Sequence, residues 1–213
     1  MKKIDIEETF KRLEEKNPEP KTELNFNSAF QFLIAVILSA QTTDKAVNKV
    51  TFNLFNRAPC AASLAKMKVV EVEKIICEIG LYKKKAKFII KTANLIIQKH
   101  NGVVPANRKE LEKLPGVGRK TAGVVLNTIY SQCEIGIDTH ILRVSGRLGI
   151  VNSKNVNKLE SQLIRVVPDR YKLNAHNLLL LHGRYICKAR KPKCTFCFLT
   201  DLCNFGKQNG VIN

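Results

Sequence analysis

The most informative stretch of this sequence is Leu111-Glu112-Lys113-Leu114-Pro115-Gly116-Val117-Gly118-Arg119-Lys120-Thr121-Ala122. It predicts a helix that ends before Pro115, a tight turn through Gly116 and Gly118, and a second helix. Backbone N–H groups at the start of that second helix face outward and can bind phosphate. An ordinary αα-corner fits the same pattern. A P-loop is excluded, because Arg119 separates the last glycine from the lysine.

Lys120 lies in the first turn of the second predicted helix, beside Arg119. The helix dipole and the neighbouring cation both disfavour a charged ammonium at this position. A neutral lysine amine is a nucleophile that forms Schiff bases, and in DNA the matching electrophile is C1′ of a deoxyribose that is losing its base. The alternative is a surface lysine that contacts phosphate.

A second motif, Ile137-Asp138-Thr139-His140, begins a helix after a polar, glycine-containing stretch near residues 131–137. We place a boundary between two lobes in that stretch, and clefts between lobes often bind ligands. Asp138 is foremost an N-cap residue. A carboxylate at a lobe boundary can also stabilise positive charge on a sugar, as carboxylates do in glycoside cleavage.

Four cysteines near the C-terminus are separated by six, two and five residues: Cys187, Cys194, Cys197 and Cys203. Four thiols in one short segment are typical of a shared metal centre. Their spacing matches neither the zinc-ribbon pattern nor the ferredoxin runs, so it leaves zinc and iron–sulfur both open. The remaining cysteines are scattered, and we expect them to be core thiols: Cys60, Cys77 and Cys133.

The segment between the first two of these four cysteines is rich in cations: Lys188, Arg190, Lys191 and Lys193. A loop held at both ends by a metal and carrying four cations is a candidate phosphate contact. The alternative is a loop that is merely solvated.

Composition is consistent with a partner of negative charge. The sequence has 36 Lys and Arg against 18 Asp and Glu, a formal net charge of +18. Part of this excess is compositional, but a protein this basic usually binds a polyanion. The N-terminus lacks a secretory signal, and the longest apolar stretch, residues 32–40, is too short to span a bilayer. We expect a cytosolic protein that does not enter a membrane.

Apolar residues recur at helical spacing along almost the whole chain, and no stretch alternates as a strand would. We therefore predict an all-α fold of roughly ten helices in two lobes.

Together, the turn at 114–121, the motif at 137–140 and the four cysteines resemble the endonuclease III family of the helix-hairpin-helix glycosylase superfamily. Further segments extend the likeness over nearly the whole chain: Leu24-Asn25-Phe26, Leu38-Ser39-Ala40-Gln41, Gly80-Leu81-Tyr82 and Leu181-His182-Gly183-Arg184-Tyr185.

The resemblance implies a central helical bundle at residues 22–132 that carries the helix-hairpin-helix motif. Residues 1–21 and 133–213 would form a second lobe, with one structural [4Fe–4S] cluster on the four C-terminal cysteines. The implied activity is that of a bifunctional DNA glycosylase and AP lyase in base excision repair. Its substrates would be oxidised pyrimidines and abasic sites in double-stranded DNA. We expect the protein to act as a monomer in the bacterial cytosol, associated with the nucleoid.

The resemblance also assigns roles to single residues. Lys120 would be the Schiff-base nucleophile and Asp138 the catalytic carboxylate, facing each other across a cleft. Gln41 and Leu81 would enter the DNA helix to fill the gap and wedge the strands, although Gln41 also suits a plain loop and Leu81 a core position. The hairpin would contact DNA through four residues: Gly116, Gly118, Arg119 and Thr121.

Three other functions compete with this interpretation. A monofunctional adenine-type glycosylase is disfavoured by Lys120 and by a length that leaves no room for an extra lesion-reading domain. A non-catalytic helix-hairpin-helix DNA-binding module with a structural zinc would be colourless and would leave DNA intact. A ferredoxin-type redox protein would leave the charge and the hairpin unexplained.

Overall fold

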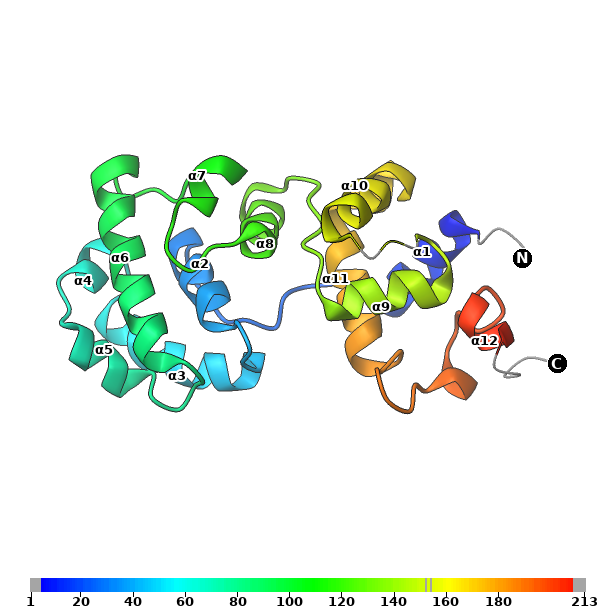
Figure 1. The fold of residues 1–213 in the computed structure, drawn as a ribbon, viewed down its shortest axis with the longest axis horizontal. Helices are drawn as coiled ribbons and strands as arrows, with labels where there is room; N and C mark the ends of the chain where they lie inside the picture. Colours follow the sequence, from blue (N-terminus) through cyan, green and yellow to red (C-terminus); the bar gives the residue numbers. More distant parts are fainter. Residues whose placement is uncertain (1–4, 152, 154, 209–213) are drawn as a thin grey trace. The chain divides into compact units, whose positions relative to one another are not determined.

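The computed structural model describes residues 5–151, 153 and 155–208. Over these residues the chain forms twelve α-helices and one 3₁₀ turn, with no strand (Figure 1). The prediction of an all-α fold is confirmed. The helices outnumber the roughly ten that we expected for helices of ordinary length, because four of them contain only five to seven residues.

The chain divides into two compact units, each with its own hydrophobic core. We call residues 23–131 the hairpin unit, and residues 1–22 with 132–213 the cysteine unit.

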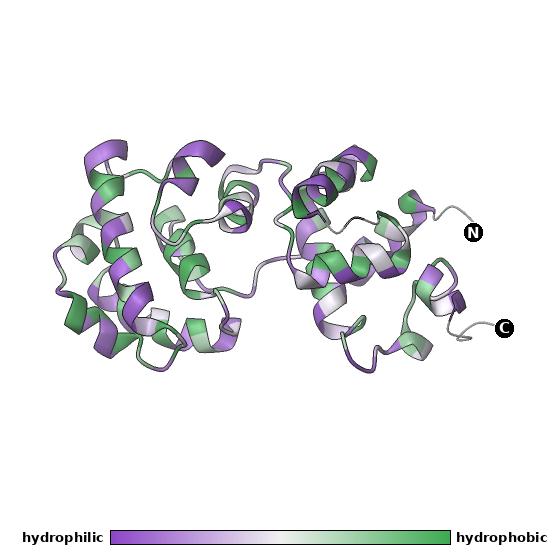
Figure 2. Cartoon of the chain, in the orientation of Figure 1, coloured by the Kyte–Doolittle hydropathy of each residue, from purple (hydrophilic) through white to green (hydrophobic). Residues whose placement is uncertain are grey.

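The hairpin unit contains seven helices: α2 (Ala29–Leu38), α3 (Asp44–Arg57), α4 (Ala61–Ala65), α5 (Val69–Ile75), α6 (Tyr82–His100), α7 (Arg108–Glu112) and α8 (Arg119–Tyr130). Helix α2 is apolar along nearly its whole length and is drawn mainly green in Figure 2. A helix that is apolar all round is buried, and every residue of α2 from Phe30 to Leu38 is buried. It packs against α3, α6 and α8, so the helix that follows the predicted turn rests on the buried core of this unit.

The cysteine unit contains the remaining elements of the described chain: α1 (Ile6–Lys16), α9 (Thr139–Leu148), α10 (Val156–Val166), α11 (Asp169–Tyr185), the 3₁₀ turn Cys194–Phe196 and α12 (Asn204–Gln208). Helix α11 packs against both α1 and α9, and α12 packs against α9. The stretch that we expected to be polar is only partly so, because Ile135 and Ile137 are buried in the core of this unit.

No helix among the described residues is both long enough and apolar enough to cross a membrane.

Candidate DNA-binding hairpin, carboxylate and metal centre

The predicted helix–turn–helix is present. Helix α7 ends at Glu112, and α8 begins at Arg119 with Gly118 as its N-cap residue. The turn between them is fixed from below, because the buried Thr92 hydroxyl of α6 donates a hydrogen bond to the Pro115 carbonyl at 3.0 Å.

Gly116 is the position in this turn where only glycine fits. Its φ of +82° lies in the left-handed region. A Cβ atom there would lie 3.0 Å from Ile37 Cγ2 and 3.0 Å from Phe88 Cδ2. Gly118 differs, since its φ is −99° and no heavy atom lies within 4 Å of a Cβ built on it. Gly116 therefore shapes the turn, while Gly118 leaves the start of α8 uncovered.

We expect Gly116→Ala to lower the free energy of unfolding of the hairpin unit by about 2 kcal/mol, because left-handed strain and crowding add together. The measurement is chemical denaturation of the variant beside wild type. Gly80→Ala is the matched control, because a Cβ at Gly80 meets nothing within 4 Å. It should change stability by less than about 0.5 kcal/mol. Equal stability of the two variants would contradict this account of the turn.

The start of α8 presents cations to solvent. Arg119 and Lys120 are exposed, and Thr121 is half-buried. Gly118 has no side chain to cap the helix, so the first turn of α8 receives no hydrogen-bond acceptor from its N-cap residue. Backbone N–H groups at a helix start and neighbouring cations together suit an anionic ligand.

Asp138 is the N-cap residue of α9, as predicted. Its Oδ1 accepts a hydrogen bond of 2.8 Å from the Ile141 backbone N–H. This hydrogen bond holds the carboxylate in one orientation. Because the residue is only half-buried, part of it stays accessible.

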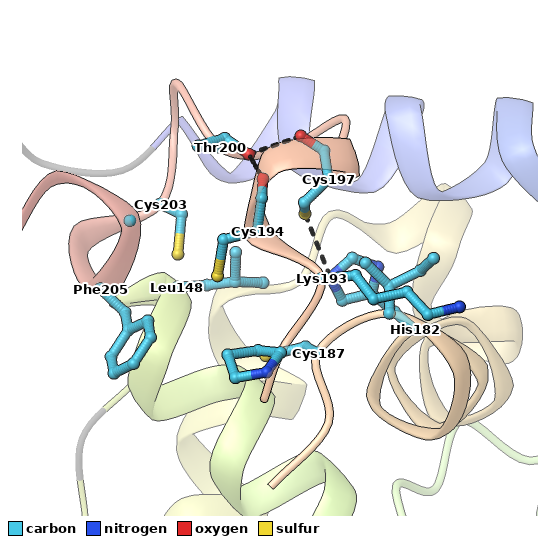
Figure 3. A pocket seen from close by; sticks show the side chains of 12 residues that line it. Leu148, His182, Cys187, Lys193, Cys194, Cys197, Thr200, Cys203 and Phe205 are labelled. Carbon is cyan, nitrogen blue, oxygen red and sulfur yellow. Dashed lines mark hydrogen bonds between the residues drawn. The ribbon is translucent and has the colours of Figure 1, made fainter. Parts of the chain in front are cut away.

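The four predicted ligand cysteines line one cavity in the cysteine unit. Figure 3 shows the side chains of Cys194, Cys197 and Cys203 directed toward this space, with Cys187 at its far side. The Thr200 hydroxyl lies 2.7 Å from the Cys194 carbonyl oxygen and 2.6 Å from that of Cys197, which closes the turn that carries both thiols.

This arrangement suits a shared metal centre, because four thiols line one cavity. Burial raises the pKa of the Cys197 and Cys203 thiols, while backbone N–H groups at Leu199, Phe205 and Gly206 oppose that shift. Those amides are placed to support thiolates.

Three residues of this centre were given no role from the sequence. Arg143 Nε donates to the Cys187 carbonyl at 2.9 Å, and Arg147 donates to the Lys188 carbonyl at 2.7 Å and approaches Cys187 Sγ at 3.5 Å. His182 is buried, with Nε2 3.7 Å from Cys197 Sγ. Burial lowers the pKa of His182 to about 4. In the sequence, the four-residue spacing of Arg143 and Arg147 places both on one face of α9, and this spacing was the signal that could have found them.

The basic loop after Cys187 is exposed at each of its predicted contact residues: Lys188, Arg190, Lys191 and Lys193. Its backbone is not loose. Two carbonyls of the loop accept hydrogen bonds from Arg147, at 2.7 Å from Lys188 and 3.1 Å from Ala189. Lys191 adopts a left-handed φ of +51°. The loop therefore presents its cations from a fixed backbone.

Gln41 and Leu81 share an unusual conformation. Both are exposed, and both have a left-handed φ, +55° for Gln41 and +59° for Leu81. The alternative of a core position for Leu81 is wrong, since 59% of the residue is exposed. A non-glycine residue in this region is strained, and such strain concentrates at functional sites.

The expectation for the other three cysteines is wrong. Cys60, Cys77 and Cys133 are all exposed. Cys60 is the N-cap residue of α4, and a hydrogen bond from Ser63 lowers the pKa of its thiol. Cys133 lies in the segment between α8 and α9. Cysteine is counted among the apolar residue types. These three cysteines nevertheless lie at helix ends or in loops, outside the two hydrophobic cores.

The fold and these groups define a class of protein: helix-hairpin-helix proteins of DNA repair that carry a cysteine-bound metal centre. Residues 34–169 match the HhH-GPD superfamily of base excision DNA repair proteins, and residues 187–203 match the iron–sulfur binding domain of endonuclease III. The chain is 50% identical to endonuclease III of Escherichia coli K12 over 198 residues, which cover 93% of this chain and 94% of that protein. It is also 50% identical to endonuclease III of Haemophilus influenzae, with the same coverage.

Comparison with solved structures points to the same family. A structure described as a trapped endonuclease III–DNA covalent intermediate is 40% identical, with a TM-score of 0.90 and 96% of each chain covered. A thermostable thymine-DNA glycosylase is 28% identical, with a TM-score of 0.81 and 94% of each chain covered. The chain belongs to the endonuclease III family of the HhH-GPD superfamily. Its metal centre is an iron–sulfur centre, which resolves the alternative that the cysteine spacing left open.

Proposed function

We propose that this protein is a bifunctional DNA glycosylase and AP lyase of base excision repair. It removes oxidised pyrimidines from duplex DNA and cleaves the strand 3′ to the abasic site. The observation that carries this proposal is the likeness, at a TM-score of 0.90, to an endonuclease III that was trapped as a covalent intermediate with DNA. A covalent intermediate requires a nucleophile, and Lys120 is exposed at the start of α8 beside the hairpin turn.

Lys120 is the proposed nucleophile. Its neutral Nζ attacks C1′ of the damaged nucleotide, the bond from C1′ to the base breaks, and the base leaves with the bonding electrons and takes up a proton. Loss of the second amine proton and opening of the sugar ring give an imine between Nζ and C1′. The imine acidifies the C2′ hydrogen, so that its removal expels the 3′ phosphate by β-elimination.

Asp138 is the proposed catalytic carboxylate. Its side chain stabilises the positive charge that develops on the sugar as the base departs. The hydrogen bond from the Ile141 N–H fixes the orientation of this carboxylate.

We assign DNA binding to three groups of residues: the hairpin, the basic loop after Cys187, and the pair Gln41 and Leu81. The hairpin contributes Gly116, Gly118, Arg119 and Thr121, whose N–H groups and cation suit phosphate. The loop cations Lys188, Arg190, Lys191 and Lys193 add charge that phosphates attract. Gln41 and Leu81 fill the space that the extruded nucleotide leaves, which offsets part of the cost of unstacking.

The iron–sulfur centre is proposed to be one [4Fe–4S] cluster held by Cys187, Cys194, Cys197 and Cys203. When bound, it supplies a covalent crosslink that shapes the basic loop. The arginines of α9 hold the same loop from the protein side.

We propose a division into a central bundle at residues 22–132 and a cluster lobe at 1–21 and 133–213. Residues 1–4, 152, 154 and 209–213 lie outside the described part of the chain. We also propose that the protein works as a monomer in the cytosol, where its substrate is the nucleoid DNA.

The test is a strand-cleavage assay on an end-labelled duplex with one thymine glycol. Breaks at the lesion before any alkali treatment support the bifunctional assignment, because β-elimination cuts the strand itself. Breaks that form only after hot alkali indicate a monofunctional glycosylase. Intact DNA under both conditions, with binding retained, indicates a DNA-binding module. A duplex without the lesion is the control.

A further inference from the structure

Lys85 of α6 is the one Lys or Arg that is buried among the described residues, with 4% of it exposed. Burial of a cation costs free energy unless other interactions compensate. Among the described residues, Lys85 forms no ion pair with a carboxylate. Burial lowers the pKa of its ammonium. A residue with these properties needs a reason to be there other than stability, since an apolar side chain of similar size would pack at lower cost.

The Lys85 ammonium bonds to a single loop, the one between α2 and α3. Its Nζ donates a hydrogen bond of 2.8 Å to the Thr42 hydroxyl. That hydroxyl in turn donates to the Ala40 carbonyl at 3.3 Å, and the Thr42 N–H donates to the Ser39 carbonyl at 3.1 Å. These hydrogen bonds therefore connect Lys85 to Ala40 and Thr42, the two residues that flank Gln41. The backbone of Gln41 is left-handed.

The backbone of Lys85 is bonded to a second strained residue. Its N–H donates to the Leu81 carbonyl at 3.0 Å in the first turn of α6. Leu81 is the N-cap residue of that helix and is also left-handed. Residues in this conformation persist only where their surroundings impose it. This backbone bond is the i to i−4 bond that any residue at position 85 would make, whereas the Lys85 ammonium itself bonds only to the loop beside Gln41 among the described residues.

We propose that Lys85 is a positioning residue that holds the loop of Gln41 ready for insertion into DNA. This inference rests on the proposed function, in which the Gln41 side chain helps to replace the extruded nucleotide. A loop that is already in its bound conformation has no ordering cost at the moment of binding. Lys85 therefore acts on extrusion of the nucleotide and leaves the later covalent chemistry alone.

The experiment compares single-turnover cleavage rates on two duplexes. One carries thymine glycol paired with adenine, and the other carries it in an unpaired bulge, where little extrusion is needed. We expect Lys85→Met to slow cleavage of the paired lesion about tenfold, the scale of losing one hydrogen bond from a charged donor. Cleavage of the bulged lesion should change by less than about twofold, because its unstacking cost is already small.

Matched variants separate positioning from general damage to the fold. Lys87→Met removes an exposed lysine from the same helix and should match wild type on both duplexes. Thr42→Val, which keeps the shape of the side chain, should reproduce the Lys85→Met pattern, and Thr42→Ser should restore the wild-type pattern. In the double variant with Gln41→Ala, the loss from Lys85→Met should be smaller than in wild type, since both act on one step.

A direct readout uses 2-aminopurine opposite a non-cleavable abasic analogue. Wild type should raise its fluorescence by unstacking it, and Lys85→Met should reduce that rise at saturating protein. Equal slowing on both duplexes, or additive losses in the double variant, would overturn the proposal and leave Lys85 a purely structural residue. If wild type cleaves neither duplex, the proposed function itself fails, and this inference fails with it.

Discussion

A Lys120→Ala variant should give no covalent adduct when borohydride is added during its reaction with duplex DNA that contains thymine glycol. Wild type should give a stable adduct, because hydride reduces the imine between Nζ and C1′ to an amine. Strand cleavage should fall on the order of 10³-fold or more, the scale on which loss of a covalent nucleophile acts. The adduct is measured as a band of reduced mobility on a denaturing gel.

The control for this variant is Lys91→Ala, which removes the same charge from an exposed position of the same unit. It should trap DNA as wild type does. Binding of undamaged duplex should weaken only slightly in Lys120→Ala, since one charge of a net +18 is lost. An adduct of normal yield in Lys120→Ala would place the nucleophile elsewhere and overturn the assignment.

The second large effect is expected at the iron–sulfur centre. Cys197→Ser should yield protein with little iron and little visible absorption. Within residues 187–203, Leu199 is the one apolar side chain that is fully buried among the described residues, so this segment has little hydrophobic core of its own. The free energy of metal binding is then free energy of folding for this segment. We expect the Tm of the cysteine unit to fall by roughly 10 °C or more.

Cys133→Ser is the matched control, because it makes the same atomic change at an exposed thiol of the same unit. It should keep its iron content and its Tm. Limited proteolysis locates the damage, since Cys197→Ser should be cut between residues 187 and 203 while the hairpin unit stays intact. Full iron occupancy in Cys197→Ser would remove this residue from the ligand set.

The parts of this protein that the sequence determined are those built from neighbouring residues. The turn at 114–118 follows from a proline and two glycines whose backbone preferences are local. Asp138 caps α9 because an N-cap bond spans three residues. The metal centre was readable because its four thiols lie within one short segment, although their spacing alone did not tell zinc from iron–sulfur.

Only the tertiary structure decided the contacts between residues that are far apart in the chain. Nothing near Lys85 in sequence indicates that its ammonium is buried against Thr42, 43 residues away. The same holds for Arg147, whose bonds to the basic loop span 41 and 42 residues. The exposure of Cys60, Cys77 and Cys133 was likewise set by which surfaces the packed helices cover. Local preferences fix the turns and caps, whereas burial depends on how whole helices pack, which no short stretch of sequence specifies.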